Sequence, residues 1–159
     1  MRSIAVITSV LAICLFSLGC GEGVANPFAG SQWDVGSNHV SFSHGVAQWD
    51  TVHNSLKLKF NLLSGTTYPD AVVEVANVTT LAVNDPREAS VTISISQGMT
   101  YETITGDADA SATITFSRLD LTTLGAASGT ITGQLKRVED PSEPPAVFTA
   151  GFDSAPITY

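Results

Sequence analysis

From Trp33 onward, the apolar residues of this 159-residue chain recur at every second position. In LKLKFNL (Leu56–Leu62), four apolar residues share one face, and Lys57, Lys59 and Asn61 occupy the other. Successive side chains of a strand point to opposite faces, so this pattern predicts a strand that is buried on one side only. A period of two does not place apolar residues on one face of a helix, and it therefore restricts the domain to a β fold.

Six further segments carry the same theme and are rich in Val, Ile and Thr, as suits strands. They are His39–Ser43, Ala71–Val78, Val91–Ser96, Ser111–Ser117, Ser128–Leu135 and Val147–Phe152. Gln97–Gly98 predicts a hairpin turn, and Arg87–Ser90 favours one helical turn at most. We therefore expect one all-β domain over residues 33–159, with seven to nine antiparallel strands. An antiparallel β-sandwich is the favoured architecture, and a partly closed β-barrel is the alternative.

The beginning of the chain predicts export. Arg2 precedes an apolar run from Ile4 to Leu18. This run is about 15 residues long, whereas a membrane-spanning helix needs about 20. A positive charge, a short apolar stretch and small residues after it are the layout of a secretory signal peptide.

The end of this leader resembles the lipobox of bacterial lipoproteins. The stretch FSLGC (Phe16–Cys20) places the small Gly19 directly before a cysteine. The resemblance implies cleavage between Gly19 and Cys20 and acylation of the Cys20 thiol by palmitate-type chains. Residues 1–19 would then be the signal peptide, and residues 20–32 the lipidated cysteine with a Gly-rich tether. The alternative is cleavage after Ala25, which would release a soluble protein without Cys20.

Cysteine and charge usage restrict the partners. Cys14 and Cys20 are the two cysteines, so the domain itself contains none for a disulfide. Seven Lys and Arg stand against fifteen Asp and Glu, a net charge of −8. This balance argues against nucleic acid, which requires Lys and Arg to neutralise phosphates, and against electrostatic docking to anionic lipid. A membrane partner would therefore be reached through covalent lipid on Cys20.

The last 50 residues show a looser resemblance. ATITFSRLDLTTLG, ASGTITGQL and AVFTAGFDSAPI, in this order, resemble the closing strands of uncharacterised exported bacterial β-sandwich proteins. This resemblance supports the fold and implies no activity.

The tripeptide Gln-Trp-Asp occurs twice and is the first candidate for a ligand site. Trp33 with Asp34 and Trp49 with Asp50 could form an aromatic platform for a sugar ring, with carboxylates binding its hydroxyls. The competing interpretation is that both tryptophans are core residues, because aromatic side chains dominate core burial.

Two metal sites are weaker candidates. His39, His44 and His53 lie close together in sequence, and Asp34 or Asp50 could complete a zinc set, but solvated loop histidines fit as well. Asp107 and Asp109 alternate in a loop and could offer oxygens to calcium; the EF-hand pattern is absent there, which favours an acidic turn.

No motif predicts catalysis or a cofactor. GAASG (Gly125–Gly129) has its serine in the fourth place, unlike the nucleophile motif G-x-S-x-G, and there is no phosphate loop or dinucleotide fingerprint. The Pro-rich segment Arg137–Ala146 predicts a projecting loop between two strands. We expect no enzyme and no cofactor, but a lipid-anchored cell-envelope protein with a structural or binding role, at the outer membrane in a Gram-negative cell. Its partner would be an envelope protein or a glycan. The alternative is a binding module for glycan or calcium.

Overall fold

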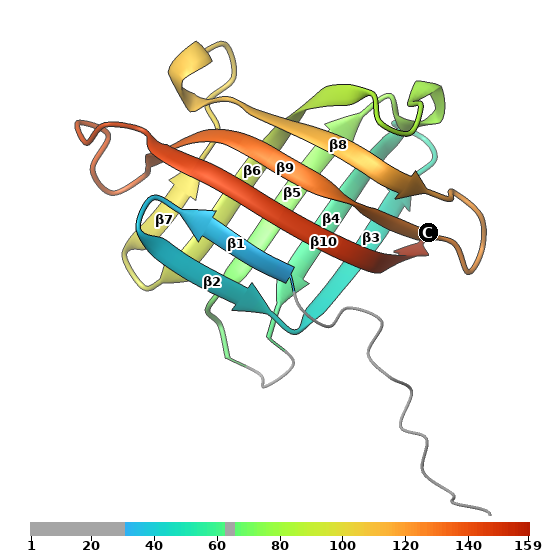
Figure 1. Cartoon of the computed structure of the whole chain (residues 1–159), viewed down its shortest axis with the longest axis horizontal. Coiled ribbons are helices and arrows are strands. Elements are labelled where there is room, and N and C mark those ends of the chain that lie inside the picture. The colour runs from blue at the N-terminus through green and yellow to red at the C-terminus, as the bar shows by residue number, and fades with distance from the viewer. Residues whose placement is uncertain (1–30, 63–65) are drawn as a thin grey trace, which may run out of the picture.

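A computed structural model of the chain describes residues 31–62 and 66–159. It contains ten strands and two short 3₁₀ helices within these ranges (Figure 1). The strands are β1 (Ser31–Val35), β2 (Asn38–Phe42), β3 (His44–Asp50), β4 (Ser55–Asn61), β5 (Asp70–Ala76), β6 (Pro86–Ser96), β7 (Met99–Glu102), β8 (Ala112–Leu119), β9 (Ala126–Arg137) and β10 (Ala146–Thr158). The 3₁₀ helices are η1 (Val78–Thr80) and η2 (Ala108–Ala110). Gly19, Cys20, both cleavage positions and the tether up to residue 30 lie outside the described residues.

The strands form one continuous, closed sheet. Strands β3 to β6 pair in sequence, β6 pairs with β7 and β8, both of these pair with β9, and β9 pairs with β10. The ring closes where Ile157 and Thr158 of β10 run parallel to Ala47 and Gln48 of β3. The β1–β2 hairpin extends this ring from the other half of the same edge of β10.

The all-β prediction is confirmed, and the architecture is the barrel given as the alternative to the sandwich. Seven strands, β3 to β6 and β8 to β10, close the ring, while β1, β2 and the short β7 are additions to it. The physical reason lies in two long strands. β6 and β10 have 11 and 13 residues, so each passes from one layer to the other and joins the two sheets that a sandwich would keep apart.

All seven predicted strands are present, but β1 and β3 were not predicted, and β6 and β10 extend well beyond their predicted ranges. Arg87–Ser90, considered as a helical turn, belongs to β6, where Arg87 pairs with Ile114 of β8. The predicted hairpin turn at Gln97–Gly98 joins β6 to β7. β1 begins at Ser31, inside the segment predicted as tether.

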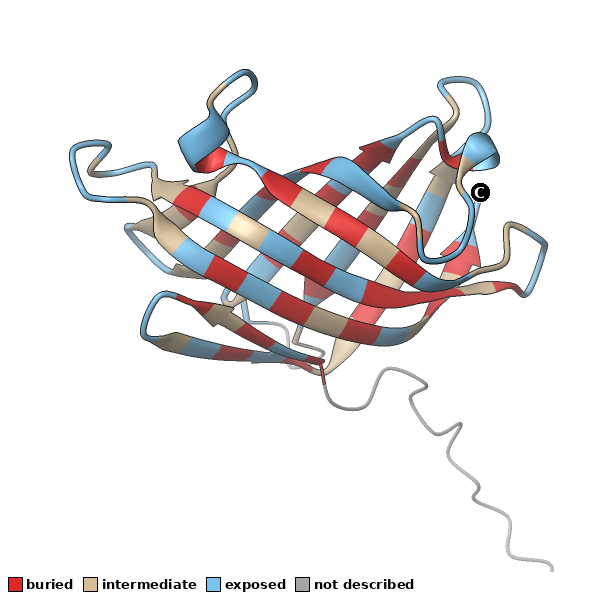
Figure 2. Cartoon of the chain, turned by 45° about the horizontal axis from the view of Figure 1, so that its top comes forward, coloured by how far each residue is buried: buried red, intermediate tan, exposed pale blue. Residues whose placement is uncertain are grey.

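Aromatic rings fill the centre of the barrel. The Trp33 indole is fully buried and packs edge-on against Phe42, Phe60 and Phe148, with ring centroids 4.6–5.6 Å apart. Phe152 links this cluster to β8, because its ring contacts both Phe60 and Phe116 of β8. Figure 2 shows the alternation of buried and exposed residues along each strand that results from this core. Because side chains occupy the centre, the outside of the barrel is left as the surface for binding.

The strand directions place each connecting loop at one of the two ends of the barrel. Because β3, β5 and β10 run in the same direction, the β3–β4 turn, the β5–β6 segment and the C-terminal residue lie at one end, together with the β8–β9 loop (Figure 1). We call this the Tyr159 end. The β1–β2 turn, the β4–β5 segment, the β6–β7 turn and the β9–β10 loop lie at the opposite end.

Candidate functional site

A row of polar side chains crosses the outer face of the barrel. The strand registers place Gln48 opposite Lys57, Lys57 opposite Glu74, and Glu74 opposite Ser90. Gln48, Lys57 and Glu74 line a hollow of about 350 Å³, together with Asp50, His53 and Ser55 from the β3–β4 turn and its flanks. The hollow therefore lies on the outer face of β3 to β5, close to the Tyr159 end.

A second hollow, of about 500 Å³, adjoins the first one and shares Ser55 and Glu74 with it. Its walls are the end of β5, the stretch of β6 from Arg87 to Ser90, the residues 103–105 after β7, and Ala110–Ser111. We call the two hollows together the outer groove.

The second hollow exists because β5 and β6 separate. Their pairing ends at Glu74 opposite Ser90, and from Ala89 back to Pro86 the strand β6 pairs with β8 instead. If the ladder continued, the next antiparallel pairs would be Val75 with Ala89 and Ala76 with Glu88. Neither pair is formed, and all four residues line the hollow. Backbone polar groups thus add to the polar lining of the outer groove.

Most charged side chains of the outer groove are paired, either with each other or with a neighbouring side chain. Lys57 forms an ion pair with Glu74 on the neighbouring strand, and Arg87 lies 2.9 Å from the Asp85 carboxylate. Asp50 accepts a hydrogen bond of 2.7 Å from His53 Nδ1. This bond lowers the pKa of Asp50 below its usual value, as do the bonds from the backbone N–H groups of Val52 and His53.

Hydroxyl groups make up much of the remaining lining. Ser55, Ser90, Thr103, Thr105 and Ser111 contribute them. The Thr103 hydroxyl accepts a hydrogen bond from the backbone N–H of Val91 at 3.0 Å, so its position is fixed by β6. Paired charges and many hydroxyls give the groove the chemistry of a site for an uncharged polar molecule.

The structure does not bring the two predicted tryptophans together as a platform. Trp33 is fully buried in the core, so it cannot present its ring to a sugar, and the platform prediction is wrong for this residue. Asp34 instead contacts the exposed His39 across the β1–β2 hairpin. Trp49 is half-buried and packs on the ring of Tyr159 at 5.5 Å, while the adjacent Asp50 lines the outer groove.

The predicted metal sites do not assemble. Residues 31–62 and 66–159 contain no group of three or more His, Cys, Asp or Glu side chains placed to hold an ion. The histidines do not share a carboxylate: His39 contacts Asp34, whereas His53 contacts Asp50. In the proposed calcium loop, the Lys136 ammonium contacts Asp107 at 2.8 Å and lowers the pKa of that carboxyl, which also accepts the Asp109 N–H. The Lys136 ammonium therefore occupies the place that a calcium ion would take.

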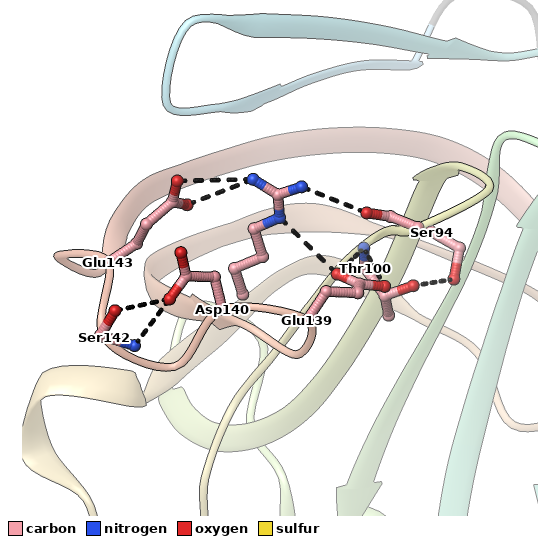
Figure 3. A network of polar contacts seen from close by, with 8 residues as sticks. Ser94, Thr100, Glu139, Asp140, Ser142 and Glu143 are labelled. Atoms are coloured by element: carbon pink, nitrogen blue, oxygen red, sulfur yellow. Dashed lines mark hydrogen bonds and ion pairs between the residues drawn. The ribbon is translucent and has the colours of Figure 1, made fainter.

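The Pro-rich loop between β9 and β10 is tied to the β6–β7 hairpin, as Figure 3 shows. The Glu139 carboxylate accepts the backbone N–H of Thr100 at 2.9 Å, and this bond lowers the pKa of Glu139. Arg137 donates to Glu143 and to the carbonyl of Gly98. The loop follows β9 as predicted, but its side chains contact the β6–β7 hairpin at the same end of the barrel rather than project freely.

Comparisons with known proteins give no relative: no family model, curated protein or solved structure matches the chain significantly. The part of the chain that the structure describes contains no helix long and apolar enough to span a membrane. Lys57, Glu74 and Ser90 were not identified from the sequence. Each is a polar position in an alternating strand, but only the register of two strand pairs, β4 with β5 and β5 with β6, brings them into one groove.

Proposed function

We propose that this protein is a lipid-anchored protein of the bacterial cell envelope with a binding role. The anchor rests on the leader from Arg2 to Leu18 and on Cys20 directly after Gly19. An acidic domain without a basic cluster has no electrostatic means of staying at an anionic membrane, so acylated Cys20 would supply the attachment.

The binding role rests on the outer groove, which we assign to a neutral, hydroxyl-rich ligand such as a glycan. The observation that carries this assignment is the pairing of Lys57 with Glu74 inside the groove, next to a lining of Ser and Thr hydroxyls. A charged ligand would have to break such a pair. Sugar hydroxyls can instead donate to the carboxylates and accept from the ammonium without separating them.

We favour binding over catalysis because the Asp50–His53 pair is open to water. The His53 side chain is 76% exposed. A catalytic base works best in a site that excludes water and keeps its proton acceptor oriented toward the substrate. His53 is oriented by Asp50, but solvent surrounds it.

Metabolic labelling with an alkyne-tagged palmitate analogue tests the anchor. We expect label on the wild-type protein and none on Cys20→Ala, since no other cysteine follows the leader. Equal labelling of both proteins would show that the lipid route is wrong.

Thermal unfolding with neutral oligosaccharides tests the groove, because a ligand that binds only the native state raises Tm. Ser90→Trp fills the groove from an exposed position on β6 and should abolish the shift. Thr132→Trp is the matched control, since Thr132 is exposed on β9 away from the groove. A Tm shift that survives in Ser90→Trp would exclude the groove as the site.

A further inference from the structure

Two apolar side chains protrude from the Tyr159 end of the barrel. Val52, at the tip of the β3–β4 turn, is 84% exposed, and Leu124, in the β8–β9 loop, is 96% exposed. Leu124 also has a φ of +76°, a backbone conformation that costs free energy for a residue other than glycine. The fold thus holds a large apolar side chain fully in solvent and at a strained position, which calls for a reason beyond packing.

Tyr159 lies between the strand that precedes the first tip and the loop that carries the second. The Tyr159 ring, itself 57% exposed, packs on Trp49, which directly precedes the β3–β4 turn. Its hydroxyl donates to the carbonyl of Leu121 at 3.2 Å, so the β8–β9 loop lies on its other side. We call Trp49, Val52, Leu121, Leu124 and Tyr159 the apolar rim.

The opposite end of the barrel also exposes two valines, Val138 and Val147, but they flank a cluster of charges. The β9–β10 loop carries Glu139 and Glu143, which pair with Arg137 at the end of β9, and Asp140, which accepts from the Ser142 hydroxyl (Figure 3). Burying this end in an apolar medium would remove water from several charges at once.

The shape of the apolar rim favours lipid over a folded protein as its partner. Val52 and Leu124 stand on the tips of two separate turns, with the aromatic rings of Trp49 and Tyr159 behind them. A bilayer deforms around separate apolar tips, whereas a protein partner would need a matching pair of cavities. The exposed Tyr159 ring suits this position, because Tyr combines an apolar body with a polar hydroxyl and is enriched at the depth of lipid headgroups, whereas the Trp49 indole nitrogen is buried.

The tether is long enough to place the apolar rim on the membrane that holds Cys20. Residues 20–30 lead to β1 at Ser31. When extended, they span up to about 40 Å, at about 3.5 Å for each residue. The rim lies at the end of β3, whose seven residues cover only about 23 Å. This length is shorter than the reach of the tether. The lipid on Cys20 and the rim can thus reach the same leaflet.

We infer that the apolar rim inserts into the headgroup region of the bilayer, so that the barrel stands on its Tyr159 end beside the acylated Cys20. This inference rests on the proposed lipid anchor. It adds an orientation: the charged β9–β10 end points away from the membrane. Because Asp50 and Asp120 lie near the rim, neutral lipid suits it better than anionic lipid.

Fluorescence quenching tests this orientation. The acylated full-length protein is reconstituted into phosphatidylcholine vesicles whose acyl chains are brominated near the headgroup, and its tryptophan emission is compared with that in unbrominated vesicles. We expect quenching of Trp49, while Trp33 stays protected in the core. Moving one Leu-sized side chain out of lipid changes the ratio of docked to undocked barrel about tenfold, so the double variant Val52→Asp/Leu124→Asp should lose most of the quenching.

Val147→Asp is the matched control, because Val147 is an exposed valine at the opposite end (65%) and its replacement should leave the quenching unchanged. A Tm measurement confirms that each variant is folded. If wild type and double variant are quenched equally, or if wild type is not quenched although palmitate labels Cys20, the inference is wrong and the anchor stands. A protein partner for the rim would give the second result. Absence of both label and vesicle association would overturn the anchor and the inference together.

Discussion

Two glycines of β9 set how closely β8 approaches it. A Cβ atom built on Gly133 would lie 2.3 Å from the carbonyl oxygen of Ser111 and 2.6 Å from the Cα of Ala112. One built on Gly129 would lie 2.5 Å from the carbonyl oxygen of Thr115. These neighbours are backbone atoms, which cannot rotate away as side chains do. The glycines of the sequence SGTITG are therefore required by the contact between the two strands.

Gly133→Ala should consequently destabilise the protein, by about 1–3 kcal/mol, the usual cost of forcing extra atoms into a packed position. Gly151→Ala on β10 is the control, since a Cβ there meets nothing within 4 Å. That variant should be neutral or slightly stabilising, because alanine reduces the entropy of the unfolded chain. Urea unfolding measures both, and equal stability of the two variants would contradict the close approach of β8 and β9.

The repeated tripeptide Gln-Trp-Asp shows where prediction from individual residues ends. Trp33 and Trp49 have identical neighbours in sequence, yet Trp33 lies at the centre of the core and Trp49 packs at the rim. The difference arises from their places along the barrel. Trp33 lies opposite Ala150, in the middle of β10, whereas Trp49 lies beyond the parallel pair of Thr158 with Gln48. Position along the barrel depends on strand pairing, which a local sequence pattern does not contain.

At the scale of elements, one irregularity in β10 lets this strand serve both layers. The pairing with β9 shifts between Phe152 and Ala155, and Ser154 takes a positive φ of 54°. The buried Ser128 of β9 holds the shifted segment: its hydroxyl donates to Asp153 at 2.7 Å and accepts the Ser154 N–H at 2.9 Å. Past this bulge, β10 continues to its parallel contact with β3.

The bulge explains why the predicted strand Val147–Phe152 was too short. The alternation of apolar residues reaches Phe152, breaks at Asp153 and Ser154, and resumes at Ala155 with the opposite parity. A strict period of two ends the strand at the break. The sequence thus predicts the alternating strands but misses β1 and β3, and it does not predict the closure of the barrel or the outer groove, because both depend on strands that change partners.

Ser128→Ala should destabilise the protein by about 1–2 kcal/mol, because it removes one hydrogen bond to a carboxylate and leaves the Ser154 N–H without its acceptor. Ser117→Ala is the control: Ser117 is exposed on β8, at the neighbouring irregularity. Thermal unfolding compares the variants, and hydrogen exchange of the Ser154 amide should accelerate in Ser128→Ala only. An unchanged exchange rate there would show that Ser128 does not hold the bulge.

For the whole molecule, the distribution of carboxylates predicts sensitivity to acid. Hydrogen bonds to the carboxylate form lower the pKa of five groups, namely Asp50, Asp107, Glu139, Asp140 and Asp153. Their causes differ: His53 acts on Asp50, Lys136 on Asp107, the Thr100 N–H on Glu139, Ser142 on Asp140 and Ser128 on Asp153. They are spread over both ends of the barrel, so protonation weakens its connections throughout.

These lowered pKa values make the folded state less stable in acid. A carboxyl group whose pKa is lower in the folded state binds protons more readily when unfolded, so it stabilises the fold above its unfolded pKa and loses this contribution as pH falls through the folded pKa. The ordinary values are 3.8 for Asp and 4.5 for Glu, which places the loss below about pH 4.5. We therefore expect Tm to fall steadily from pH 4.5 to pH 2.5. Asp153→Asn should lower Tm at pH 6 and make its fall in acid shallower, because Asn does not titrate. A Tm that rises on acidification would mean that relief of the repulsion among the fifteen acidic residues outweighs these hydrogen bonds.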